Sequence, residues 1–277
     1  MLIRNLYHLS ARDIVERLRW RWRMPKKELP QPCRVAGGPL RNGHLLLVRS
    51  GCDFWAEMAD GTYDIAVLDW CAREFAQRAA RPVAWDIGAH FGYASLCFAR
   101  MVGSEGMVHS FEPNPANLER LQANLRLNSE VAERITVHPY ALAAAEGSAR
   151  FGCSEDVDGS RSSGAHIVGT QLPLPAAAYS GFHEIEVNVS SVDELLARGE
   201  AVPHLMKIDV EGAEASVLKG AYSCLKQHSP ALAIEVHHVS AMLDCCRILF
   251  GLGYQVEMFD TPAPSTSRAF IWAKRAE

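Results

Sequence analysis

The sequence predicts an α/β protein: a doubly wound, mostly parallel seven-stranded sheet that ends with a closing antiparallel strand. From residue 65 onwards, short apolar runs alternate with segments whose apolar residues recur at helical spacing. This is the pattern of a parallel sheet with helices on both faces. Some of the runs, such as residues 204–210, indicate buried strands. Two further runs, residues 254–259 and 269–274, follow the last expected helix and indicate an antiparallel pair.

The composition favours one large domain, or one domain with a small appendage. Of the 277 residues, 48% are hydrophobic and 22% are charged, which is enough apolar content for a substantial core. No apolar run approaches the ~18 residues that cross a bilayer, and the N-terminus has no signal-peptide pattern, so we expect a cytoplasmic protein. The eight cysteines form no Cys-x-x-Cys pair, so we expect free thiols rather than disulfides or structural zinc.

The N-terminal part differs in charge from the remainder. Residues 1–30 hold eight Lys/Arg against three acids, in a chain of net charge −4. This asymmetry argues against a nucleic-acid partner for the domain. Residues 10–22 predict a basic amphipathic helix. It could touch the anionic inner membrane surface as a peripheral contact, or pack on its own domain or on a sister subunit in a homodimer.

The rest of this region is expected to extend the main domain. Prolines and glycines between residues 25 and 39 indicate a linker. Residues 44–51 and 54–59 are expected to be the two strands of a hairpin. We therefore divide the chain into an N-terminal extension of residues 1–59 and a domain of residues 60–277.

The elements of the main domain are assigned from apolar spacing. Helices are expected at residues 65–79, 94–101, 118–125, 217–225 and 240–250, and after the capping box of Ser191 and Glu194. Strands are expected at residues 83–87, 107–112, 134–142, 146–151, 184–189, 204–210 and 231–236. Residues 152–184 are rich in Gly, Ser and Pro and predict a long loop with room for one hairpin. We expect that loop and the hairpin before residue 60 to set substrate choice.

The segment VAWDIGAHFGYAS, residues 83–95, predicts a small-molecule site. Asp86 closes a buried strand, Gly88 allows a sharp turn, and Gly92 allows close approach at the start of a helix. The Gly-x-x-x-Gly spacing differs from the Gly-x-Gly-x-x-Gly that seats a pyrophosphate, which disfavours a nicotinamide oxidoreductase. Asp86 suits an ammonium group, and Glu112, at the end of the next strand, can accept hydrogen bonds from ribose hydroxyls. Together these residues favour S-adenosylmethionine as the cofactor.

With these stretches the sequence resembles the FkbM family of class I methyltransferases. The matching segments are DIGAHFGYAS, VHSFEPNPANLERLQANLRLN, VSSVDELL and LMKIDVEGAEASVLKGA, which occur in the family's order between about residues 60 and 240. The resemblance implies the Rossmann-like class I fold and S-adenosylmethionine as methyl donor. It also implies transfer to a hydroxyl of a small metabolite, sugar or glycan precursor. His90 stands where the family usually has asparagine.

The resemblance also implies cofactor contacts along the chain. The loop that starts at Asp86 would contact the methionine part, Glu112 the ribose, and Ala141 or Leu142 the adenine. The full expected cofactor-binding set is Asp86, Gly88, Ala89, His90, Gly92, Ser95, Glu112, Asn114, Ala141, Leu142 and Asp209.

Two polar clusters at strand ends supply candidates for the catalytic base. In KIDVEGAE, Asp209 or Glu211 could deprotonate the acceptor, which typically contributes ~10²–10⁴ in rate. Alternatively, Asp209 orients the cofactor's ammonium and Glu211 only favours a helix N-terminus. In IEVHH, His237 or His238 could be the base instead. No metal ligand is assigned, although Glu235 and one histidine could hold a divalent ion with Asp209 or Glu211.

The sequence thus predicts an S-adenosylmethionine-dependent methyltransferase that acts on an oxygen of a small-molecule or glycan-type acceptor. Two alternatives stay open. One is an N-methyltransferase of similar fold, because the residues alone do not distinguish a hydroxyl from an amine. The other is a non-catalytic module that binds the cofactor without turning it over.

Overall fold

The computed structural model describes residues 30–48, 53–77, 81–154, 164–170, 182–259 and 269–275. The predicted amphipathic helix of residues 10–22 lies outside these ranges, so its contacts with a membrane or a second subunit stay predictions. Among the described helices, none combines the length and the apolarity that crossing a bilayer requires.

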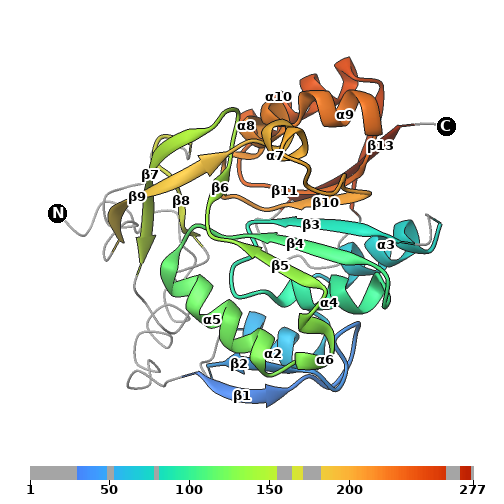
Figure 1. The fold of residues 1–277 in the computed structure, drawn as a ribbon, viewed down its shortest axis with the longest axis vertical. Coiled ribbons are helices and arrows are strands. Elements are labelled where there is room, and N and C mark those ends of the chain that lie inside the picture. Colours follow the sequence, from blue (N-terminus) through green and yellow to red (C-terminus); the bar gives the residue numbers. More distant parts are fainter. Residues whose placement is uncertain are drawn as a thin grey trace, which may run out of the picture.

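A seven-stranded sheet forms the centre of the protein (Figure 1). Its strand order is β12-β13-β11-β10-β3-β4-β5. The five strands from β11 to β5 are parallel, and β13 pairs antiparallel with both β11 and β12. The bounds are β3 Val83–Ile87, β4 Met107–Phe111, β5 Ile135–His138, β10 Leu205–Ile208, β11 Ala231–Val236, β12 Tyr254–Met258 and β13 Ala269–Arg275. The predicted sheet and its closing antiparallel strand are confirmed.

Helices cover both faces of this sheet, because successive side chains of a strand point to opposite faces. Ala84 and Val108 belong to one core cluster, whereas Trp85 and Ile87 belong to the other. The first face is covered by α3 Ile65–Ala76, α4 Tyr93–Met101, α5 Pro115–Arg126 and α6 Ser129–Ala132. The second is covered by α7 Val192–Ala197, α8 Glu214–Gly220, α9 Tyr222–His228 and α10 Val239–Gly251 (Figure 1).

The helix ends test the sequence signals directly. The predicted capping box opens α7: Ser191 Oγ accepts the Glu194 N–H, and Glu194 Oε2 accepts the Ser191 N–H, both at 3.2 Å. The helix predicted at residues 217–225 is instead two helices, α8 and α9. They divide at Gly220, where a Cβ would lie 2.0 Å from the carbonyl oxygen of Ala143. The chain therefore turns where it packs against its own backbone.

A second, four-stranded sheet packs beside the main one. Its strands, in the order β6-β9-β7-β8, are β6 Ala141–Leu142, β9 Phe182–Ser190, β7 Gly147–Ser154 and β8 His166–Ile167. The single strand predicted at residues 134–142 is therefore wrong, because β5 and β6 belong to different sheets. Pro139 lies between them and has no N–H to continue a ladder. The predicted loop at 152–184 contains β8, paired antiparallel with β7.

The N-terminal hairpin differs from the prediction. β1 Gln31–Arg34, expected within the linker, pairs antiparallel with β2 His44–Leu47. Residues 54–59, expected as a strand, lie in the helix α2 Asp53–Asp60. Trp55 and Met58, three residues apart, are both buried and join the core cluster of α3 and α4, which suits helical rather than strand periodicity. The domain boundary at residue 59 stays a prediction.

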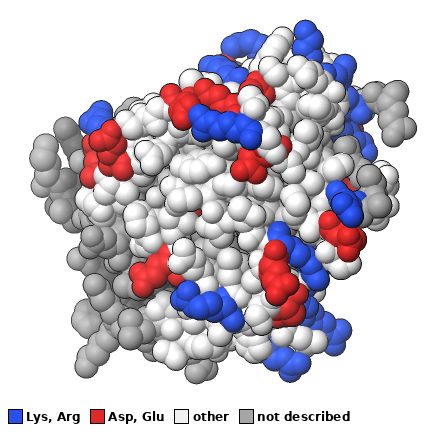
Figure 2. All heavy atoms as spheres, in the orientation of Figure 1, with Lys and Arg blue, Asp and Glu red and all other residues white. Residues whose placement is uncertain are grey.

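The surface carries mixed charge. Figure 2 shows acidic and basic side chains next to one another in several small groups on the face in view. One such contact is the ion pair between Arg100 Nη2 and Glu130 Oε1 at 2.7 Å. Exposed pairs of this kind contribute little to stability.

Candidate active site

A cavity of about 390 Å³ lies at the carboxyl ends of the main strands. Open α/β sheets bind ligands there, at the point where strand order reverses, which here lies between β3 and β10. The volume falls within the range of ~300–1,000 Å³ that is usual for small-molecule sites. The lining residues are Phe54, Tyr63, Ile87, Gly88, His90, Phe111, Glu112, Pro113, Asn117, Ala141, Leu142, Phe151, Ala165, Ile167, Asp209, Val210, Glu211, Glu235 and His237.

The loop after β3 uses its amide groups to hold its own shape. The N–H groups of Gly88 and Ala89 both donate to the carbonyl oxygen of Phe111, at 3.0 and 2.9 Å. The N–H of His90 donates to Glu112 Oε2 at 2.8 Å. A pyrophosphate-binding loop presents such amides to its ligand, whereas here they are engaged within the chain. The hydrogen bonds therefore agree with the glycine spacing in disfavouring a dinucleotide.

Two glycines set the path of this loop. Gly88 and Gly92 both have φ of 86°, a conformation that favours glycine. A Cβ on Gly88 would lie 1.8 Å from the carbonyl oxygen of Asp209, so the chain after β3 touches the chain after β10 directly. A Cβ on Gly92 would instead meet the Leu121 side chain at 3.1 Å. Gly92 thus serves packing against α5, and the close approach of a ligand there stays a prediction.

Glu112 follows β4 and lines the cavity with its carboxylate held on both sides. Its Oε1 accepts the N–H of Asn114 at 2.8 Å and the side-chain amide of Asn117 at 3.3 Å, and its Oε2 accepts the His90 N–H. Burial raises the pKa of Glu112 to about 7, although these hydrogen bonds favour the charged form. A carboxylate has about four acceptor positions, so Oε2 can accept a further bond from a ligand.

Asp86 is not among the residues that line the cavity, and its predicted contact with the cofactor stays a prediction. The side chain is fully buried beneath the loop, and its Oδ2 accepts a hydrogen bond from Ser95 Oγ at 2.5 Å. Burial raises the pKa of Asp86, and the charge of Lys207 opposes this shift. Lys207 Nζ lies 4.0 Å from Asp86 Oδ1 and 2.9 Å from Asp209 Oδ2. Asp86 therefore acts on the cavity through Lys207, which holds Asp209 in the wall.

The wall on the β10 and β11 side carries a charged cluster around His237. Its Nδ1 lies 2.7 Å from Oε1 of Glu214. Its Nε2 faces three more carboxylates at 3.5 to 3.7 Å, those of Glu211, Asp209 and Glu235. Burial alone would lower the pKa of His237, but the hydrogen-bonded carboxylates outweigh it and raise the pKa to about 11. This pKa favours the imidazolium form at neutral pH, which makes His237 a poorer base than the nearby carboxylates; its role as the base stays a prediction.

Glu211 is a carboxylate of this cluster that lines the cavity and can take a proton. Burial raises its pKa, and the hydrogen bond to His237 limits the shift. Its φ of 54° is left-handed, which costs a non-glycine residue ~1–2 kcal/mol, and such strain is concentrated at functional sites. The ligand atoms of Asp209, Glu211 and His237 also lie within 4.8 Å of one another. These three side chains could hold the divalent ion that the sequence left open. An ion bound there must first displace the proton of His237.

The cavity brings together only part of the predicted set. It is lined by eight of those residues, which are Gly88, His90, Glu112, Ala141, Leu142, Asp209, Glu211 and His237. Ala89, Ser95 and Asn114 lie outside it, and Asn114 instead caps α5 by accepting the Ala116 N–H at 3.0 Å. His238 caps α10, where its Nδ1 accepts the Ala241 N–H at 3.0 Å. His238 thus serves as a helix cap outside the cavity lining, and its catalytic role stays a prediction.

Several lining residues had no individual prediction. Phe54 lies in α2, Phe151 and Ile167 lie in β7 and β8 of the small sheet, and Ala165 directly precedes β8. Phe54, Ala165 and Ile167 lie in the two regions that were expected to set substrate choice, and Phe151 directly precedes the second of them, but irregular apolar spacing gave no signal for single residues. Together they make the side of the cavity away from the main sheet largely apolar.

The fold and the cavity define a class I methyltransferase: seven strands in this order, one antiparallel, with the cavity at the switch point. The methyltransferase FkbM domain profile matches residues 86–256, more than half of the chain, and the protein belongs to this family. The chain is 30% identical over 157 residues to the hexuronic acid methyltransferase AglP of Haloferax volcanii, covering 56% of each protein. It thus spans about half the length of that relative.

Two further proteins are similar. The 31-O-demethyl-FK506 methyltransferase FkbM of Streptomyces tacrolimicus is 29% identical over 205 residues, covering 63% of this chain and 73% of that protein. Among solved structures, a methyltransferase FkbM from Methylobacillus flagellatus aligns with a TM-score of 0.51 and 22% identity, over 70% of this chain and 44% of the other. That likeness shows the shared fold.

Proposed function

We propose that this protein is an S-adenosylmethionine-dependent O-methyltransferase that acts on a hydroxyl of a sugar or natural-product precursor. One observation carries the proposal. A single cavity has Glu112 on the β4 side of the Gly88 loop and the Asp209, Glu211 and His237 cluster on the β10 side. Glu112 suits the ribose of a nucleoside. In the second group, Asp209 suits the cofactor's ammonium group and Glu211 suits a polar acceptor.

The donor set fits the cofactor. The carboxylate of Glu112 can accept a hydrogen bond from a ribose hydroxyl. Apolar walls for the adenine ring come from Ile87, Phe111 and Leu142. Of the two carboxylates next to Lys207, Asp209 lines the cavity and Asp86 does not, so we assign Asp209 the ammonium contact that the sequence placed on Asp86. When bound, the cofactor supplies a methyl group on a sulfonium.

The chain's own residues supply positioning and proton transfer. Glu211 accepts the proton of the acceptor hydroxyl, and His237 stays protonated and holds the surrounding carboxylates in place. A positioned base typically contributes ~10²–10⁴ in rate. Holding the hydroxyl in line with the methyl contributes more, up to effective molarities of ~10⁵–10⁸ M.

The relatives support the acceptor class. One is named for a hexuronic acid and the other for a demethylated oxygen of a natural product. Both names point to polar, oxygen-rich acceptors. The apolar side of the cavity formed by Phe151 and Ile167 suits the face of a sugar ring or a macrocycle.

The test is a transfer assay with methyl-labelled S-adenosylmethionine and three acceptors: a hexuronic acid glycoside, a neutral hexoside and an amino sugar. We expect mass spectrometry to place the label on a hydroxyl oxygen. Glu211→Gln should lower kcat about 10²-fold or more, whereas Glu119→Gln, an exposed change on α5, should not. Label on the amine would support the N-methyltransferase alternative. Cofactor binding without transfer to any acceptor would support the non-catalytic one.

A further inference from the structure

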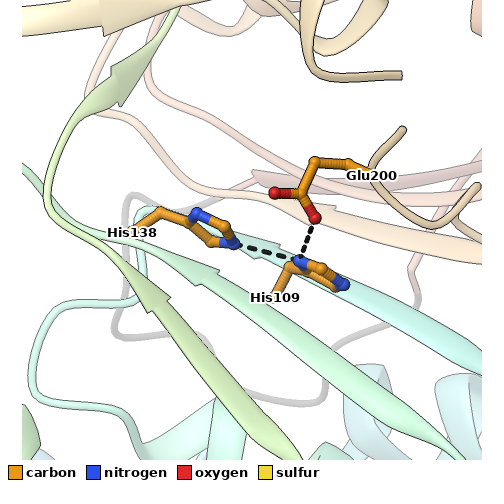
Figure 3. A group of neighbouring side chains, drawn as sticks. All are labelled: His109, His138 and Glu200. Atoms are coloured by element: carbon orange, nitrogen blue, oxygen red, sulfur yellow. Dashed lines mark hydrogen bonds and ion pairs between the residues drawn. The ribbon is translucent and has the colours of Figure 1, made fainter. Parts of the chain in front are cut away.

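A second group of metal-binding side chains lies outside the cavity. His109 of β4, His138 at the end of β5 and Glu200 in the loop after α7 point toward one another (Figure 3). Nδ1 of His109 lies 3.0 Å from Nε2 of His138 and 3.3 Å from Oε2 of Glu200. None of the three lines the cavity, and methyl transfer gives them no role.

We propose that these three side chains form a divalent transition-metal site whose preferred ion is Zn²⁺. Zinc binds imidazole nitrogen and carboxylate oxygen at about 2.0–2.2 Å, so two ligands of a tetrahedral site lie about 3.3 Å apart. The His109–Glu200 contact matches this separation, and the two histidines need to part by only about 0.3 Å. The ligand atoms of His138 and Glu200 lie within 4.8 Å of each other and would draw closer around an ion. Two imidazoles favour zinc over Mg²⁺ or Ca²⁺, which prefer oxygen ligands. The fourth position is left for water.

The three facing atoms suit a cation better than they suit one another. A neutral imidazole nitrogen without its proton is an acceptor, and so is the Glu200 carboxylate. Without an ion, the single Nδ1 proton of His109 must serve both His138 and Glu200. Burial lowers the pKa of His109, and burial together with His109 lowers the pKa of His138 to about 4. Burial therefore favours the neutral form of both rings, and neutral imidazole is the form that binds metals.

Neighbouring groups orient the ligands, as is usual around metal sites. Tyr140 Oη lies 3.0 Å from Nδ1 of His138. A proton on Nδ1 that donates to this oxygen leaves Nε2 free to bind the ion. On the other side, the indole Nε1 of Trp85 donates to the carbonyl oxygen of Ala201 at 3.1 Å. This bond ties the loop that carries Glu200 to the sheet.

The metal site would stabilise one wall of the cavity and take no part in the reaction. The His138 ring stacks on Phe111 with centroids 4.5 Å apart, and Phe111 lines the cavity. An ion would join β4, β5 and the loop after α7, and so fix that wall. The Glu200 side chain is 32% exposed, so solvent ions and chelators can reach the site.

The test uses full-length, tag-free protein freed of metal with a chelator. Calorimetric titration should show one tight Zn²⁺ site per chain. Excess zinc should raise Tm by about 5 °C or more, and Mg²⁺ at the same concentration should not. Glu200→Gln, a change in a partly exposed loop, should weaken zinc binding at least tenfold, and His138→Gln should do the same. His228→Gln, at an exposed histidine on α9, is the matched control and should bind zinc like the wild type.

His237→Gln separates this site from the charged cluster in the cavity. We expect this variant to keep both the zinc stoichiometry and the rise in Tm. The proposal is overturned if the wild type binds no zinc or if Glu200→Gln binds it as tightly as the wild type. It is also overturned if His237→Gln is the variant that loses the site.

Discussion

Replacing Gly88 by alanine tests the direct contact between the chain segments that follow β3 and β10. The new Cβ would lie 1.8 Å from the carbonyl oxygen of Asp209, so one of the two segments must move. Gly103 is a matched control, because its φ of 73° is also left-handed but a Cβ there would meet nothing within 4 Å. Left-handed strain should destabilise Gly103→Ala by ~1–2 kcal/mol. Gly88→Ala adds overpacking of ~1–3 kcal/mol, for a total of about 2–5 kcal/mol.

Urea denaturation and thermal unfolding of both variants measure this difference. Each kcal/mol should lower Tm by about 2–4 °C in a domain of this size. Because Asp209 lines the cavity, Gly88→Ala should also weaken S-adenosylmethionine binding by calorimetry, whereas Gly103→Ala should not. Equal stability of the two variants, with normal cofactor affinity in Gly88→Ala, would refute the argument that Gly88 is required by this contact.

Three further predictions follow from buried charges and caps. Burial raises the pKa of Glu112 to about 7, so its ionised form, the better acceptor for a ribose hydroxyl, predominates only above that pH. Cofactor affinity should therefore rise about tenfold from pH 6 to pH 8, and Glu112→Gln should bind more weakly and lose this pH dependence; an unchanged profile in the variant would contradict the assignment. Lys207→Met leaves the carboxylates of Asp86 and Asp209 without their cation. It should lower the free energy of unfolding, measured by urea denaturation, by about 3–5 kcal/mol. A loss below about 1 kcal/mol would argue against Lys207 as the link between the two carboxylates. Ser191→Ala removes the α7 cap and should cost ~1 kcal/mol with kcat unchanged, so a large loss of activity would show that this cap matters to the site.

The sequence predicts the main sheet well because its strands are short apolar runs whose type and order follow from alternation with helices. It fails at residues 54–59, where a six-residue apolar segment fits either a strand or a helix until Trp55 and Met58 find a common core. It also fails at Pro139, where one apolar run supplies strands to two different sheets.

The site is predicted in outline but not side chain by side chain. Asp86 alternates with Trp85 and Ile87 along β3, so its carboxylate points to the α4 face and Ser95 rather than out of the sheet edge. The charge state of His237 depends on carboxylates from three segments of the chain. The group of His109, His138 and Glu200 likewise arises only when parallel strands bring distant residues together. Spacing along the sequence carries none of this information.

We propose that one cavity holds the cofactor nucleoside at Glu112, the cofactor's ammonium group at Asp209 and the acceptor at Glu211. A crystal structure with S-adenosylhomocysteine tests it most directly. We predict that the ribose lies within hydrogen-bonding distance of the Glu112 carboxylate and that the sulfur points toward Glu211 and His237. A nucleoside bound elsewhere, or one whose ribose leaves Glu112 without contact, would contradict the claim.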